Sequence, residues 1–170
     1  MIELRAYQPA HLPTLLTLTL PEDQQVFTST PVQVLARITG DPNRKPVTIL
    51  DGETPIGLFL LCVGEHRDKY LPEPDPAAVA LTALSIDPAR QGQGVGFTAM
   101  GLLPGFVREN YPAAQRLILA VNQRNHTALR LYARAGFVIS HTRDGPAGPQ
   151  WVMECALPPG EGMERPVSSG

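Results

Sequence analysis

Apolar and polar residues follow one another along the chain with periods that predict both strands and helices. Residues 2–7 (IELRAY) alternate between apolar and polar side chains, which is typical of a half-buried strand. Residues 9–20 predict a short helix, and residues 30–40 predict a second helix with Thr30 as its N-cap and Gly40 just after its end. The chain is therefore expected to begin with one strand followed by two helices.

The strongest local signal is a β-hairpin over residues 46–64. Two runs of β-forming residues flank the pair Asp51 and Gly52, a sequence that favours a tight hairpin turn. The next segment, residues 65–79 (EHRDKYLPEPDPAAV), is rich in acids and carries prolines at alternate positions, which regular structure does not tolerate. We predict an exposed loop there.

The second half of the chain alternates strands with helices. Residues 80–87 (ALTALSID) are apolar on both faces, which predicts a central strand of the sheet. The remaining predicted elements are a helix over residues 94–110 that Pro104 should kink or interrupt, a strand over 115–121, a helix after the N-cap Asn125, and a hairpin over 137–157. This order predicts an α/β fold with an antiparallel front half and one locally parallel strand pair.

Composition narrows the class of protein. The chain has 170 residues, of which 43% are hydrophobic and 18% charged, so we expect one globular domain over residues 1–157 and a disordered tail over 158–170. The net charge of −2 gives no reason to expect nucleic acid or an anionic membrane as a partner. No apolar run approaches the roughly 20 residues of a membrane-spanning helix. Cys62 and Cys155 lie in apolar runs, which is typical of buried, reduced thiols in a cytoplasmic protein.

Residues 90–96 (RQGQGVG) place three glycines at alternate positions between a predicted strand and a predicted helix. The spacing matches neither a P-loop, which needs a lysine after its second glycine, nor the GxGxxG dinucleotide fingerprint. Glycines allow positive φ and close backbone approach, and the helix behind them presents free N–H groups. Such a turn favours a phosphate or pyrophosphate, although a glycine-rich turn with only a packing role fits the same residues.

Two motifs resemble those of the GNAT superfamily of N-acetyltransferases. Residues 86–96 (IDPARQGQGVG) are similar to its V-x-P-x-x-[RQ]-x-x-G-x-[GA] loop, and residues 125–137 (NHTALRLYARAGF) are similar to its N-x-x-A-x-x-[LF]-Y-x-x-x-G-F segment. The motifs stand in the family's order, with an apolar strand between them. The resemblance implies a mixed, mostly antiparallel sheet flanked by helices, with a splayed parallel strand pair. It also implies an enzyme that moves an acetyl group from acetyl-CoA to an amine.

The resemblance further implies which residues bind acetyl-CoA. In the family, main-chain amides of the glycine loop bind the pyrophosphate, and exposed backbone of the preceding strand pairs with the pantetheine arm. The matching loop residues here are Gln91, Gly92, Gln93, Gly94, Val95, Gly96 and Phe97, and the matching strand residues are Leu84, Ser85 and Ile86. Asn125 matches a residue that also contacts acetyl-CoA. No metal is implied.

Tyr132 has two interpretations. It fits a core aromatic on the apolar face of its helix, whereas the resemblance implies the general acid that protonates the departing CoA thiolate. A phenol with a pKa near 10 can fill that role. The general base is less defined, because residues 79–86 carry no carboxylate. We assign it to Glu65, with His66, Asp87 or a water chain to a more distant acid as alternatives, although Glu65 also fits an ordinary solvated loop acid.

The N-terminal half should supply the pocket for the acceptor. Acids in residues 21–27 and 65–75 favour a small-molecule cationic amine such as a polyamine, although a helix cap and a solvated loop explain the same acids. Residues 21–38 resemble, more weakly, the bacterial spermine/spermidine acetyltransferase-like branch. A GNAT-fold module that binds acyl-CoA without transferring it, as a sensor or scaffold, stays open, as does an unrelated phosphate-binding α/β domain. The resemblance also allows a homodimer formed through the late strands.

Overall fold

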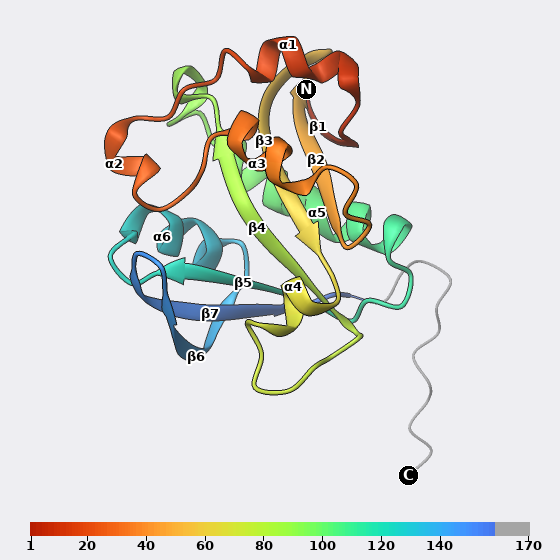
Figure 1. Cartoon of the computed structure of the whole chain (residues 1–170), viewed down its shortest axis with the longest axis vertical. Helices are drawn as coiled ribbons and strands as arrows, with labels where there is room; N and C mark the ends of the chain where they lie inside the picture. The colour runs from red at the N-terminus through yellow and green to blue at the C-terminus, as the bar shows by residue number, and fades with distance from the viewer. Residues whose placement is uncertain (159–170) are drawn as a thin grey trace.

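The computed structural model describes residues 1–158, which form a seven-stranded mixed sheet with helices on both faces (Figure 1). The strands are β1 (Ile2–Ala6), β2 (Arg44–Asp51), β3 (Thr54–Cys62), β4 (Ala78–Ile86), β5 (Arg116–Asn122), β6 (Val138–Gly145) and β7 (Gly148–Ala156). Across the sheet they run β1-β2-β3-β4-β5-β7-β6, and only the β4–β5 pair is parallel among these neighbours. The predicted mixed, mostly antiparallel sheet is confirmed.

The longer helices follow the predicted order, and α4 falls in the segment predicted as a loop. They are a 3₁₀ turn η1 (Pro9–His11), α1 (Leu12–Leu15), α2 (Glu22–Gln25), α3 (Pro31–Ile38), α4 (Glu65–Asp68), a 3₁₀ turn η2 (Pro88–Arg90), α5 (Val95–Asn110) and α6 (His126–Arg134). Thr30 caps α3 as predicted: its Oγ1 accepts from the N–H of Gln33 at 3.4 Å, and the Gln33 side chain accepts from the N–H of Thr30 at 2.9 Å. The predicted tail, residues 158–170, lies outside the described residues except for Pro158.

Two clusters of buried side chains cover the two faces of the sheet. One face packs against α5 and α6, through residues such as Leu103 and Tyr132. The other face packs against α1 and α3, through residues such as Leu15 and Val34. In Figure 1, α3 lies in front of the sheet and α5 lies behind it. A ligand that passes between two strands of this sheet would therefore connect the two layers.

Pro104 was expected to kink or interrupt α5, and the helix is not interrupted there. The helix runs from Val95 to Asn110 with Pro104 inside it. A proline there removes one backbone hydrogen bond, a cost of about 3 kcal/mol. Leu103 and Val107 are fully buried in the main core cluster, so packing of this face offsets that cost.

The segment predicted as an exposed loop is more ordered than its prolines suggest. It begins with α4, and its Arg67 is buried with 7% of its surface exposed. The guanidinium of Arg67 donates to Asp68 at 2.8 Å and to the carbonyl of Ala78 at 3.3 Å. These bonds tie α4 to the start of β4, so residues 65–71 form a wall of the molecule beside the central strands.

Candidate active site

The parallel strands β4 and β5 stay paired over only part of their length. The pairs Ala78–Arg116, Val79–Leu117 and Ala80–Ile118 define the contact, and β4 continues to Ile86 without further pairing to β5. The register between β3 and β4 shifts just beyond that point, and Ala83 has a positive φ of 58°. A bulge of this kind bends the strand that carries it. The two strands therefore splay apart as predicted and leave a slot between them.

Backbone groups at the end of β4 face this slot in alternation. The N–H of Asp87 donates to the carbonyl of Ile56 on β3 at 2.7 Å, so Asp87 faces β3. Because backbone groups of successive strand residues point to opposite sides, Ile86 and Leu84 face the slot and Ser85 faces β3. The carbonyl of Ile86 accepts from the side chain of Gln91 at 3.4 Å, in agreement with this orientation. Leu84 and Ile86 thus remain candidates for pairing with pantetheine, whereas the backbone of Ser85 does not reach the slot.

The glycine loop lies at the open end of the slot and presents unpaired amides. Gly92 and Gly94 have φ of 80° and 78°, which glycine adopts without strain. Gly94 is the N-cap of α5, and the first helical bond runs from the N–H of Thr98 to its carbonyl at 3.0 Å. The first-turn amides of Val95 to Phe97 precede this bond and point out of the helix end. The amide of Gln91 differs, because it already donates to the carbonyl of Pro88 at 3.2 Å.

Side chains fix the loop to two neighbouring elements. Gln91 exchanges two hydrogen bonds with Gln24 of α2, each 3.0 Å long. Arg90 donates to Asp51 of β2 at 2.5 Å. The loop also approaches α6 closely, since a Cβ placed on Gly96 would lie 3.1 Å from Leu131 Cδ2. A larger residue at position 96 would require the side chain of Leu131 to shift.

Tyr132 and Asn125 lie on α6, beside the slot. Tyr132 is 8% exposed, packs edge-on against Phe137 with ring centroids 5.9 Å apart, and belongs to the same cluster as Val95, Leu84 and Ile86. Burial raises the pKa of the Tyr132 phenol far above its usual value, so the hydroxyl keeps its proton at neutral pH. The Oδ1 of Asn125 accepts from the N–H of Ala128 at 3.2 Å, which confirms the predicted N-cap.

A pocket of about 320 Å³ lies over the slot on the opposite face of the sheet from Tyr132. Thr82 and Ala83 of β4 and Ala120 of β5 line its floor, so it meets the slot where the strands diverge. Phe27 and Tyr70 line other parts of its wall. A molecule in this pocket would face a group held in the slot.

The structure does not bring Glu65 to this pocket. Its side chain is 87% exposed, and Glu65 does not line the cavity. The neighbouring His66 does line it, and its Nε2 lies 3.0 Å from Oδ2 of Asp41. Glu65 is the first residue of α4 and points to solvent, whereas His66 turns inward. Asp87 is occupied elsewhere as the N-cap of η2, where it accepts from the N–H of Ala89 at 3.0 Å.

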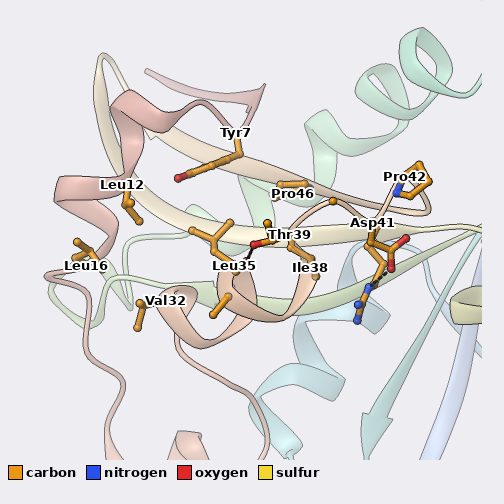
Figure 2. Close-up of a pocket in the computed structure, with 13 residues that line it drawn as sticks. Tyr7, Leu12, Leu16, Val32, Leu35, Ile38, Thr39, Asp41, Pro42 and Pro46 are labelled. Atoms are coloured by element: carbon orange, nitrogen blue, oxygen red, sulfur yellow. Dashed lines mark hydrogen bonds and ion pairs between the residues drawn. The ribbon is translucent and has the colours of Figure 1, made fainter.

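A second, larger cavity of about 760 Å³ lies on the other side of α3, between that helix and the first elements of the chain. Figure 2 shows its lining side chains, among them Leu12 of α1, Leu35 of α3 and Tyr7. No residue of β4, α6 or the glycine loop lines it. Of the two cavities, the smaller one lies over the slot and is lined by residues of β4 and β5.

A mixed sheet with a splayed parallel pair, a glycine loop at the open end and a buried tyrosine beside it defines a class of acyl-transferring proteins. The sequence profile described as "Acetyltransferase (GNAT) family" matches residues 12–137. The chain belongs to this family and is an N-acetyltransferase. The uncharacterized N-acetyltransferase YbbJ of Bacillus subtilis (strain 168) is 38% identical over 153 residues, which cover 89% of this chain and 95% of that protein.

Solved structures of this family share the fold. Aminoglycoside acetyltransferase AAC(6')-Ib with coenzyme A and kanamycin has a TM-score of 0.75 at 20% identity, covering 92% of this chain and 95% of that one. Spermidine N-acetyltransferase from Vibrio cholerae with CoA and spermine has a TM-score of 0.64 at 18% identity, with the coverage again 92% and 95%. These likenesses establish the architecture and not the acceptor.

Three further observations concern the described part of the chain. Residues 1–158 contain no cluster of three or more potential metal-ligating side chains. Within the same residues, no helix has the length and apolar character that crossing a membrane requires. Cys62 is buried as predicted and Cys155 is half-buried, and both are free thiols.

Proposed function

We propose that this enzyme transfers an acetyl group from acetyl-CoA directly to the primary amine of a small molecule. The observation that carries the proposal is the shared location of three features at one slot. The amides of the glycine loop lie at its open end, the backbone of Leu84 and Ile86 faces it, and Tyr132 belongs to the cluster beside it.

Acetyl-CoA fits these features. The unpaired first-turn amides and the positive end of the α5 dipole suit the pyrophosphate. The slot-facing backbone of Leu84 and Ile86 offers a strand edge with which the amides of the pantetheine arm can pair. The unstrained positive φ of Gly92 and Gly94 holds the amides toward the ligand. Within residues 1–158, Gln91 is the one proposed loop residue whose amide is engaged, so its role would lie with the side chain that holds the loop to Gln24.

The reaction balances without a covalent enzyme adduct. The amine nitrogen attacks the thioester carbonyl carbon, a C–N bond forms, and the C–S bond breaks. The sulfur leaves as a thiolate and takes the proton of the Tyr132 hydroxyl, while the amine loses one proton to a base. The backbone at the Ala83 bulge is free of pairing to β5 and would polarise the carbonyl oxygen. His66, which lines the pocket and pairs with Asp41, is better positioned than Glu65 to receive the amine proton.

Two measurements test this function. Isothermal titration with acetyl-CoA should show saturable binding, and a thiol-release assay over a panel of amines should show CoA release in excess of hydrolysis for at least one class. Binding without release for every amine would favour the alternative, an acyl-CoA-binding sensor or scaffold. Absence of binding would contradict both.

A further inference from the structure

The charged side chains that line the acceptor pocket, the smaller pocket over the slot, are basic. Arg37, Arg44 and Lys69 line it beside the titratable His66, and no aspartate or glutamate of residues 1–158 does. The acids expected there from the sequence lie elsewhere. Those of α2 do not line the pocket, Asp68 pairs with Arg67, and Asp75 pairs with Arg116 at 2.9 Å.

Only part of this positive charge is compensated. Asp41 lies 2.8 Å from Arg44 and 3.0 Å from His66, and the exposed Glu65 lies 3.9 Å from His66. Arg37 donates to two neutral oxygens, the hydroxyl of Ser29 and a backbone carbonyl of α3. Lys69 lies over the ring of Tyr70, with Nζ 5.1 Å from the centroid. Neither Arg37 nor Lys69 has a carboxylate within 4.0 Å among the described residues.

Neighbouring groups add to the positive field. Two of the aromatic side chains that line the pocket are themselves covered by guanidinium groups. Arg124 lies 5.9 Å from the ring centroid of Phe27, and Arg143 lies 4.8 Å from that of Tyr70. Thr28, on the same wall, has a buried Oγ1 without a hydrogen-bond partner in residues 1–158.

We propose, on the basis of the function above, that the natural acceptor is a small amine that also bears an anionic oxyacid group, a carboxylate or a phosphate. Arg37 and Lys69 bind that group, and the amine reaches toward the slot between Ala83 and Ala120. A polyamine would place several positive charges beside uncompensated cations, which costs free energy. The volume of about 320 Å³ suits a molecule of this size.

The test is acetylation of paired amines with and without the anion, with kcat/KM expressed per unprotonated amine at the assay pH. The pairs are phenylalanine with phenylalaninamide and O-phosphoethanolamine with ethanolamine, and spermidine is the polycation. We expect kcat/KM to be about tenfold or more higher for the anionic member, because a charge-assisted hydrogen bond is the stronger kind. The two pairs distinguish a carboxylate from a phosphate.

Two variants test whether Arg37 and Lys69 cause the preference for the anionic amine. In the double variant Arg37→Gln, Lys69→Gln, the anionic member should lose its advantage mainly through KM, because the contact exists before and during transfer. Arg108→Gln removes a positive charge at the end of α5, outside the pocket, and should keep the preference. Equal or better use of the neutral amines or of spermidine by the wild type would overturn the inference and leave the proposed function intact.

A binding measurement distinguishes failure of this inference from failure of the proposed function. Titration of each amine into the enzyme saturated with CoA reports recognition without turnover. Tighter binding of the anionic members with no CoA release from acetyl-CoA would support the inference and contradict the proposed transfer. Equal binding of anionic and neutral members, or no binding of either, would contradict the inference.

Discussion

We assign the side chain of Asn125 two tasks that substitutions can separate. Its Oδ1 caps α6 by accepting from the N–H of Ala128 at 3.2 Å, and we propose that its amide nitrogen donates to acetyl-CoA. Asn125→Ala removes both groups. Loss of the cap should cost about 1 kcal/mol of unfolding free energy. For a chain of this size, that corresponds to a fall in Tm of about 2–4 °C.

Asn125→Ser is the matched variant. Serine caps helices about as well as asparagine and adds no charge, so the Tm should stay within about 1 °C of the wild type. It lacks the amide nitrogen, and one lost hydrogen bond should raise the KM for acetyl-CoA by about three- to tenfold. Thermal unfolding followed by circular dichroism gives the first quantity, and thiol release at varied acetyl-CoA gives the second.

Each of the two roles of Asn125 can be contradicted without the other. If Ser and Ala lower the Tm equally, the capping bond is not the source of the stability. If the KM for acetyl-CoA in Asn125→Ser stays within about twofold of the wild type, which is below the effect of one hydrogen bond, Asn125 does not contact the ligand.

Two further predictions concern stability. Ala83→Gly should leave the unfolding free energy unchanged or raise it by up to about 1 kcal/mol, because φ at Ala83 is 58° and glycine relieves that strain. Ala80→Gly on the same strand should cost about 1 kcal/mol or more in denaturant unfolding, and equal losses at both positions would refute the strained bulge. Hydrogen bonds from the N–H of Ala77 and from Arg116 hold the pKa of Asp75 below its usual range. The ionised Asp75 therefore stabilises the fold above about pH 4, and this stabilisation is lost as the pH falls through the lower pKa of the folded state. The difference in Tm between the wild type and Asp75→Asn should therefore become smaller in acid. A difference that stays constant with pH would contradict this.

Sequence patterns predicted the fold well because its elements carry local signals. The hairpin at Asp51 and Gly52, the cap at Thr30 and the strand over residues 80–87 each follow from a few adjacent residues. Pro104 was predicted to kink or interrupt α5, and the helix continues through it because tertiary packing of Leu103 overrides the local signal for an end there. Burial of this kind depends on residues far along the chain, so the proline alone could not reveal it.

The features of the candidate site also divide into those that the sequence predicts and those that depend on tertiary packing. The glycine loop and the cap at Asn125 could be predicted, because each is a contiguous motif with its own backbone requirements. The bulge at Ala83 could not, since no glycine marks it. The charge of the acceptor pocket was also missed. Acids are frequent in residues 65–75, but which side chains turn inward depends on the packing of α4 against β4.

Tyr132 provides the most direct test of the account. Tyr132→Phe removes the proposed proton donor while keeping a ring that packs against Phe137. With an amine that the wild type acetylates, kcat should fall by about 10²–10⁴, while the Kd for acetyl-CoA stays near the wild-type value. A kcat within a few-fold of the wild type, at unchanged acetyl-CoA binding, would contradict the role of Tyr132 and leave it a packed core aromatic.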